Sequence, residues 1–390
     1  MNNFNFCIPT RIIFGKDTHK DVGNIISEYG YKKILIHYGG GSIKTNGCYD
    51  DIVRSLQENS IDFIELGGVE PNPKASLVRK GVELCRENNV DLILAVGGGS
   101  VIDSSKAIGF TAPCDNDVWD YFDGLSTPTK HIPIAVVLTI AASGSEMSDS
   151  CVLTNKELGL KRGCHSELNK PVFSILNPEL TYSVSKYQTA CGIVDIMMHT
   201  LERYMTNCGS FSPTDDIAAS IVKSTMINGI KAMENPCDYE ARAALMWSGS
   251  LSHNGLTGLG RDYFMISHQI EHEISGMYDR VHHAAGLSII FPAWCKWAYK
   301  YNIPRFLAFA RDIMGVNNAG TDDEIILQAI DKLYEFFSML GMPTHLSDVD
   351  IDDSHFNEMA EKCTRYGKRV LKGYVNYGVK EIVEILNLAK

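Results

Sequence analysis

The chain has 390 residues, of which 45% are hydrophobic and 21% are charged, and its formal net charge is -11. This length is enough for two domains of ordinary size. The acidic charge argues against a nucleic-acid partner, because binding to a phosphate backbone usually needs a basic face.

Cysteine usage points to a reducing compartment. The 11 cysteines are scattered singly from Cys7 to Cys363, and no two have CxxC spacing. We interpret them as reduced thiols, with neither a disulfide framework nor a zinc ribbon. The first residues lack the basic flank and apolar core of a signal peptide, and no apolar run approaches the roughly 20 residues that span a bilayer. We therefore expect a soluble, cytoplasmic protein with no membrane partner.

Short runs rich in Ile, Val and Leu alternate with helical stretches through the first half of the chain. We predict buried strands at residues 33–38, 61–66, 91–96 and 132–139, and helices at residues 50–59 and 73–89. Such alternation is typical of a parallel sheet covered by helices on both faces. In sheets of this kind, ligands bind beyond the carboxyl ends of the strands.

The second half has helical periodicity, and strand-like runs largely disappear. The helical windows are residues 188–206, 214–233, 239–251 and 322–340. We therefore predict two domains, an α/β domain at residues 1–184 and an all-helical domain at residues 185–390.

Two of the predicted strands end in glycine runs. The first is followed by Gly39-Gly40-Gly41-Ser42 and the third by Gly97-Gly98-Gly99-Ser100, which opens a helix. Glycines let a backbone approach a ligand closely, and the free N–H groups of a helix start attract phosphate. Ser100 and Asp103 have the spacing of a capping box. Because the run is not GxGxxG, the sequence leaves open whether it binds a diphosphate or only makes a tight turn.

Small and hydroxylated residues follow the last predicted strand, from Thr139 through Ser143 to Glu146. Such residues at the carboxyl end of a strand suit hydrogen bonding to a ribose or a nicotinamide. They equally suit capping of the next segment, and local reasoning does not choose between these roles.

A carboxylate and five histidines recur in the second half, at Asp195, His199, His268, His272, His282 and His283. Asp195 and His199 lie four residues apart in a helical window, as do His268 and His272, so each pair projects from one helix face. One carboxylate with several imidazoles suits a divalent transition metal that keeps an open coordination position. A lone histidine is more often a hydrogen-bonded core or surface residue. The clustering favours a metal site, but spacing alone does not say which late histidines bind.

Taken together, these motifs resemble the iron-containing alcohol dehydrogenase family, closest to its butanol dehydrogenase branch, nearly from end to end. Residues 10–15 resemble the family's opening strand, and residues 38–44 and 68–73 resemble two of its loops. Its cofactor motifs resemble Gly97-Gly98-Gly99-Ser100-x-x-Asp103-x-x-Lys106 and Gly144-Ser145-Glu146. The resemblance implies an N-terminal α/β dinucleotide-binding domain with a parallel sheet and an all-α C-terminal metal-binding domain, the dehydroquinate synthase-like fold.

The resemblance also implies metal ligands at Asp195, His199, His268 and one later histidine. It places His272 beside the substrate and nicotinamide instead, as a candidate proton relay or a residue that only shapes the pocket. For the fourth ligand, counting forward from His268 favours His282, whereas counting back through the following helix favours His283. An extra residue fits a loop more easily than a helix, so we prefer His283.

The cofactor contacts that the resemblance implies are Gly39, Gly40, Gly41, Ser42, Asn72, Gly97, Gly98, Gly99, Ser100, Asp103, Thr139, Ser143 and Lys161. Ser143 stands where the family usually has Thr, and the hydroxyl is kept. Lys161 matches a family lysine near the cofactor, and the alternative is a solvated loop charge.

The activity that follows is that of a metal-dependent NAD(P)(H) alcohol dehydrogenase or aldehyde reductase, acting on short-chain primary alcohols and aldehydes such as butanol and butanal. Iron(II) is the family expectation, and zinc or another divalent ion is an alternative. The glycine run after the first strand carries no carboxylate and has Lys44 nearby, which favours NADPH, with NADH also used. The family further suggests a homodimer built through the N-terminal strand.

Two other functions compete with this one. A lyase of the dehydroquinate synthase type would need several basic residues around the metal to bind a multiply charged substrate, and chiefly Arg203 and Arg280 are available. The other is a non-catalytic metal- or nucleotide-binding protein that has lost activity, and the intact ligand set and three intact cofactor motifs argue against it.

Overall fold

The computed structural model describes residues 1–209 and 213–390, and these form two compact units. An α/β unit contains Cys7–Val184 and Asn235–Ser250. A helical unit contains Met1–Phe6, Ser185–Glu234 and Leu251–Lys390. Helix α9 (Tyr239–His253) therefore contributes residues to both units.

A six-stranded, all-parallel sheet forms the centre of the α/β unit, in the order β1-β8-β5-β4-β2-β3. Its strands are β1 (Arg11–Phe14), β2 (Lys33–Tyr38), β3 (Asp62–Leu66), β4 (Leu92–Gly97), β5 (Ile134–Leu138) and β8 (Phe173–Leu176). The four strands predicted from apolar runs are all present. The parallel sheet confirms the predicted fold class of this half of the chain.

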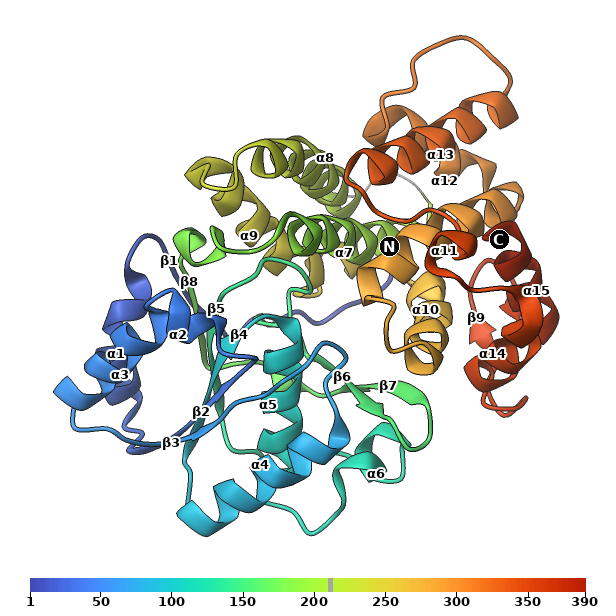
Figure 1. The fold of residues 1–390 in the computed structure, drawn as a ribbon. Helices are drawn as coiled ribbons and strands as arrows, with labels where there is room; N and C mark the ends of the chain where they lie inside the picture. The colour runs from blue at the N-terminus through green and yellow to red at the C-terminus, as the bar shows by residue number, and fades with distance from the viewer. Residues whose placement is uncertain (210–212) are drawn as a thin grey trace. The chain divides into compact units, whose positions relative to one another are not determined.

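Helices cover both faces of this sheet (Figure 1). They are α1 (Val22–Tyr29), α2 (Ser42–Thr45), α3 (Cys48–Glu58), α4 (Ala75–Asn88), α5 (Gly99–Thr111) and α6 (Val118–Phe122). Successive strand residues point to opposite faces, so Ile34 and Ile36 pack with α1 and α3, whereas Leu35 packs with α4 and α5. This double burial explains why the strands are continuous apolar runs.

An antiparallel hairpin that the sequence analysis did not predict follows the fifth strand. It consists of β6 (Ser150–Asn155) and β7 (Leu160–His165). Both strands mix polar and apolar residues in short segments, so neither has the apolar run that marked the central strands. Cys151 and Leu153 pack in the same core cluster as Phe110 of α5.

The helical unit contains most of the second half of the chain, which was predicted to be helical. Its helices are α7 (Lys186–Tyr204), α8 (Pro213–Glu234), α10 (Ile266–Met277), α11 (His283–Ala298), α12 (Ile303–Ala308), α13 (Asp322–Met339), α14 (Phe356–Cys363) and α15 (Val379–Leu388), with two short strands, β9 (Leu371–Lys372) and β10 (Asn376–Tyr377). The four helical windows predicted from periodicity correspond to α7, α8, α9 and α13. Over the described part of the chain, no helix is long and apolar enough to cross a membrane.

Candidate metal centre and cofactor-binding edge

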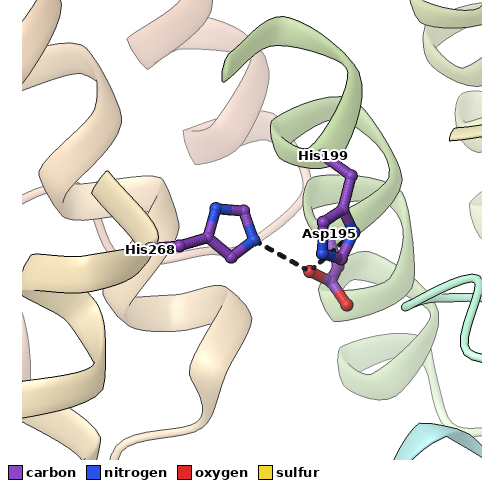
Figure 2. A group of neighbouring side chains, drawn as sticks. All are labelled: Asp195, His199 and His268. Carbon is purple, nitrogen blue, oxygen red and sulfur yellow. Dashed lines mark ion pairs between the residues drawn. The ribbon is translucent and has the colours of Figure 1, made fainter. Parts of the chain in front are cut away.

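Four side chains from three helices meet in the helical unit. Asp195 and His199 lie one turn apart on α7, His268 lies in the first turn of α10, and His283 is the first residue of α11. The Oδ1 atom of Asp195 lies 3.5 Å from His199 Nδ1, 3.9 Å from His268 Nε2 and 4.0 Å from His283 Nε2. Figure 2 shows the first three side chains converging from α7 and α10.

The geometry of this cluster fits a divalent transition metal. Bonds of about 2.1 Å at tetrahedral angles place ligand atoms about 3.4 Å apart, close to the observed separations. Asp195 is 6% exposed, His199 4% and His268 5%. Among the described residues, His199 Nδ1 and His268 Nε2 have no hydrogen-bond partner. A buried nitrogen of this kind is costly unless something binds it, so the donor set suits a metal ion.

His199 is held in the form that a metal requires. Burial, reinforced by the neighbouring imidazoles of His253 and His268, keeps the pKa of His199 well below its ordinary value. The ring is therefore neutral and offers a lone pair. The centroids of the His199 and His253 rings lie 4.0 Å apart. His253 ends α9, far from the other histidines in sequence, and no spacing signal pointed to it.

Two buried glutamates that the sequence analysis missed hold two of the histidines. Glu202 lies on α7, seven residues after Asp195, and accepts hydrogen bonds from the main-chain N–H groups of Ser267 (2.6 Å) and His268 (3.1 Å). It also accepts one from His268 Nδ1. Glu202 therefore caps the N-terminus of α10 and fixes the His268 ring with Nε2 towards Asp195.

Glu271 on α10 does the same for the next helix, because His283 Nδ1 donates to its Oε2 atom. Gly286 leaves the room for this contact, since a Cβ there would lie 2.6 Å from Glu271 Cγ. Each of α7 and α10 thus supplies both a side chain of the Asp195 cluster and the carboxylate that orients a histidine of another helix. Glu271 lies three residues after His268, so the two share a helix face, and this spacing could have drawn attention to Glu271 in the sequence.

The two remaining histidines of the predicted set lie beside the cluster. The half-buried His272 has its ring centroid 5.5 Å from that of His283. His282 is the N-cap of α11, and its ring packs edge-on against Tyr187 at 5.3 Å. Neither group of adjacent donor atoms found in the described chain includes His282. The geometry therefore brings His283, rather than His282, to Asp195.

In the α/β unit, the predicted cofactor residues gather where neighbouring strands end. They are Gly39, Gly40, Gly41 and Ser42 after β2, Asn72 after β3, Gly97, Gly98, Gly99 and Ser100 at the start of α5, and Thr139 and Ser143 after β5. A Cβ on Gly98 would lie 2.0 Å from the Ile140 side chain, and one on Gly99 would lie 2.3 Å from Ser143 Oγ. Glycine is thus needed for the loop after β5 to pack against the start of α5.

Main-chain hydrogen bonds join these loops. The Thr139 N–H donates to Gly97 O at 3.1 Å, and the Gly68 N–H donates to Gly39 O at 3.0 Å. Asn72 is buried and has a φ of 54°. Lys161, on β7, is 4% exposed and therefore is not a solvated loop charge. These loops therefore lie together along one edge of the sheet, where backbone N–H groups and hydroxyls gather.

The predicted capping box of Ser100 and Asp103 is wrong. Helix α5 begins at Gly99, which puts Ser100 inside the first turn, and no side chain caps it. Asp103 is instead partly buried, and its Oδ1 atom accepts from Ser145 Oγ (2.6 Å) while Oδ2 accepts from the Val152 N–H (2.9 Å).

Lys106, one turn further along α5, completes a buried network. Its Nζ donates to Ser145 Oγ (2.8 Å), Ser148 O (3.0 Å) and Ser150 O (2.7 Å). Burial lowers the pKa of Lys106, and the neighbouring Asp103 carboxylate opposes this shift. The pair therefore ties the segment of residues 145–152 to α5.

Lys44, the cation considered for a 2′-phosphate, is already engaged within the protein. Its Nζ lies 3.1 Å from Glu65 Oε2 and over the rings of Tyr38 and Tyr49, at 4.9 and 4.4 Å. Both tyrosine hydroxyls also donate to Glu65. Glu65 on β3 thus brings a carboxylate to Lys44, although the glycine run after β2 itself carries none.

Comparison with known proteins decides the family. The profile described as "Iron-containing alcohol dehydrogenase" matches residues 9–178, and that of "Fe-containing alcohol dehydrogenase family, C-terminal" matches residues 189–389. The chain belongs to the iron-containing alcohol dehydrogenase family. The family resemblance inferred from the motifs is confirmed.

Relatives of this iron-containing alcohol dehydrogenase cover nearly its whole length. NADH-dependent butanol dehydrogenase A of Clostridium acetobutylicum is 41% identical over 386 residues, 99% of each chain. NADPH-dependent aldehyde reductase YqhD of Escherichia coli is 37% identical over 372 residues, 94% of each chain. The crystal structure of NADH-dependent butanol dehydrogenase A from Thermotoga maritima is 37% identical, with a TM-score of 0.96 over 100% of this chain and 99% of the other.

Proposed function

We propose that this protein is a metal-dependent alcohol dehydrogenase and aldehyde reductase, which transfers hydride between NAD(P)(H) and short-chain primary alcohols or aldehydes such as butanol and butanal. The observation that carries the proposal is the cluster of buried Asp195, His199 and His268 with the partly buried His283, in which one nitrogen of each imidazole lies within 4.0 Å of the same Asp195 oxygen. Butanol dehydrogenases and an aldehyde reductase among the relatives support the substrate class.

Iron(II) is the metal that we assign to this cluster, with zinc or another divalent ion as the alternative. When bound, such an ion supplies a Lewis acid for an alcohol or carbonyl oxygen. Asp195 contributes the negative charge of the ligand set, and three neutral imidazoles contribute lone pairs. Glu202 and Glu271 hold two of these rings in the orientation that binding requires.

We assign cofactor binding to residues 1–184 and metal binding to residues 185–390. The backbone N–H groups at the start of α5 suit the diphosphate, since a helix N-terminus after a glycine run favours anions. The hydroxyls of Thr139 and Ser143 suit the ribose and nicotinamide, and Lys161 suits a nearby acceptor. Asp103 acts indirectly, because its carboxylate is bound to Ser145 and to the Val152 N–H.

His272 is our candidate for moving a proton to and from the substrate oxygen. It is half-buried and lies beside His283, and an imidazole can both accept and return a proton near neutral pH. The alternative is that it only shapes the pocket. A His272→Ala variant that lowers kcat while leaving metal content unchanged supports the relay, whereas an increase in KM alone supports the shaping role.

We propose NADPH as the preferred cofactor, with NADH also used, because Lys44 lies beside the glycine run after β2. A cytoplasmic homodimer joined through β1 completes the proposal. Strand β1 is an edge of the sheet, and its first and last residues are exposed. Light scattering of the purified protein measures this oligomeric state.

The test of the activity is the rate of NADPH oxidation with butanal, for chelated protein and for the same protein reloaded anaerobically with iron(II) or zinc. We expect turnover only after reloading, and a repeat with NADH measures cofactor preference. Metal content is determined in parallel. Full metal loading and tight NADPH binding without turnover would contradict the proposed reaction.

A lyase acting on a multiply charged substrate would need free cations, and the two arginines considered for this role are already bound to main-chain carbonyls. Arg203 donates to the main-chain carbonyls of His199 and Ser252, and Arg280 donates to those of Val349 and Asp350. Both guanidinium groups are thus used in holding the fold.

A further inference from the structure

Two of the cysteines face each other across the β6–β7 hairpin. Cys151 on β6 pairs directly with Cys164 on β7 in the antiparallel register. Directly opposed residues of antiparallel strands have Cα atoms about 4.5–5.5 Å apart, within the roughly 4.4–6.8 Å that a disulfide spans. The two side chains are on the same face and pack in one core cluster, where Cys151 is 0% and Cys164 7% exposed.

The two thiols interact in the reduced protein. The neighbouring Cys151 side chain lowers the pKa of the Cys164 thiol, although burial opposes this shift. Burial raises the pKa of Cys151 well above its ordinary value. Cys164 is thus both the more acidic and the more exposed of the two sulfurs, which are the properties of an attacking thiolate.

The hairpin that carries this pair also anchors the buried network of Asp103 and Lys106. The Ser166 N–H donates to Asp149 O at 3.0 Å, and hydrogen-bonded pairs alternate along an antiparallel ladder. The Cys151–Cys164 pair is therefore a hydrogen-bonded one, and the polar main-chain groups of the residues on either side of Cys151 point outward.

The outward-pointing main-chain groups of Ser150 and Val152 are hydrogen-bonded to α5. The Val152 N–H donates to Asp103 at 2.9 Å, and Ser150 O accepts from Lys106 at 2.7 Å. The residues that flank Cys151 therefore link the hairpin to α5, the helix that starts at the glycine run.

We propose that Cys151 and Cys164 form a reversible redox-modification site, a dithiol that hydrogen peroxide converts to a disulfide. The Cys164 thiolate attacks one peroxide oxygen and breaks the O–O bond, giving a sulfenic acid and one water. The Cys151 thiol then attacks that sulfur, expels the second water and forms the S–S bond. Overall, two thiols and one peroxide give one disulfide and two waters, and a dithiol reductant reverses the change.

The bond draws β6 towards β7 at Cys151 and so displaces the main-chain groups of Ser150 and Val152. We expect the oxidised protein to bind NADPH about tenfold more weakly, the size expected for losing one hydrogen bond to a charged group. Only this binding effect rests on the proposed function; formation of the bond does not.

Peptide mapping without reduction tests the covalent step. Trypsin cleavage after Lys156 and Arg162 puts the two cysteines on separate peptides, each with a single cysteine, so a linked peptide identifies the bond without ambiguity. The full-length protein is treated with a small excess of hydrogen peroxide and then alkylated. We expect the linked pair, lighter by two hydrogen atoms than the sum of its parts, and its loss after treatment with dithiothreitol.

Matched variants separate this pair from general thiol oxidation. Cys85→Ser removes a cysteine of the same core cluster that is 2% exposed, and we expect it to form the link as the wild type does. Cys164→Ser and Cys164→Ala should lose the link and should keep their NADPH affinity after peroxide treatment. The metal-free protein is used for NADPH titration, so oxidation of the metal cannot mimic the effect.

A peptide map in which other cysteines are oxidised while Cys151 and Cys164 stay unlinked would overturn the proposal. A linked pair with unchanged NADPH affinity would overturn its coupling to the cofactor edge. Reduced protein that binds neither NADPH nor NADH would instead count against the proposed function, and the peptide map would still decide whether the dithiol is a modification site.

Discussion

Glu271 on α10 accepts a hydrogen bond from Nδ1 of His283 on α11. Since the imidazole donates at Nδ1, its Nε2 atom carries the lone pair, and that atom lies 4.0 Å from Asp195 Oδ1. The Glu271 carboxylate therefore fixes both the tautomer of the His283 ring and its direction towards Asp195.

Replacing Glu271 by Gln should weaken metal binding by about 10- to 100-fold, because an amide holds the His283 tautomer less firmly. Glu202→Gln should have at least as large an effect, because Glu202 also caps α10. Metal affinity is measured by competition with a chromogenic chelator. Glu273→Gln is the control. Glu273 is also buried on α10, but it lies two residues after Glu271 and therefore projects from a different face of the helix. Equal affinity losses in the Glu271 and Glu273 variants would refute this role.

The fourth ligand is tested by a pair of neighbouring substitutions. His283→Ala should lose stoichiometric metal, whereas His282→Ala should retain it, because His282 precedes α11 and its ring packs against Tyr187. Metal content after dialysis is the measurement, and thermal unfolding with and without added metal gives a second one. A metal present at 100 times its Kd stabilises the fold by about 2.7 kcal/mol, so only the His282 variant should show a metal-dependent rise in Tm. The reverse pattern would assign the ligand to His282.

Cofactor preference should respond to the ion pair of Lys44 and Glu65. Lys44→Ala should raise the KM for NADPH more than that for NADH, because only NADPH carries a 2′-phosphate. Glu65→Gln should shift preference further towards NADPH, since it leaves Lys44 without its carboxylate partner at 3.1 Å. The ratio of kcat/KM for the two cofactors is the measurement. An unchanged ratio in both variants would show that this pair does not select the cofactor.

Acid stability should depend on His37, which is 0% exposed and whose ring nitrogens lie 2.7 Å from Leu66 O and 2.8 Å from Ser104 Oγ. Burial lowers the pKa of His37 to about 4. Below about pH 6.5 the unfolded chain binds a proton there that the folded chain does not, so stability falls as the pH drops towards 4. Because the pKa of His37 falls from 6.5 to about 4 on folding, its full contribution to the loss of unfolding free energy is about 3 kcal/mol.

Urea unfolding of the metal-free protein between pH 7 and pH 4 measures this loss. His37→Asn should be less stable at pH 7 but should lose less stability on acidification. The exposed His355 provides the control, and His355→Gln should follow the wild type. Parallel pH profiles for the wild type and the His37 variant would remove His37 as the cause.

The sequence by itself determined the family, the parallel sheet and the helical character of the second half. These features depend on local patterns: apolar runs for strands buried on both faces, helical periodicity, and glycine runs at the ends of β2 and β4. It also supplied Asp195, His199 and His268, because helical spacing or family motifs mark them.

Tertiary structure decided what depends on contacts between distant segments. Glu202 and Glu271 orient histidines on other helices, and Glu65 meets Lys44 across 21 residues of chain. The sequence already favoured His283 over His282, but only the start of α11 showed His283 near Asp195, since one residue of shift rotates a side chain by about 100° around a helix. The Cys151–Cys164 pair required the register of a hairpin whose short, polar strands carry no distinctive pattern, because pairing in such strands is fixed by what they pack against.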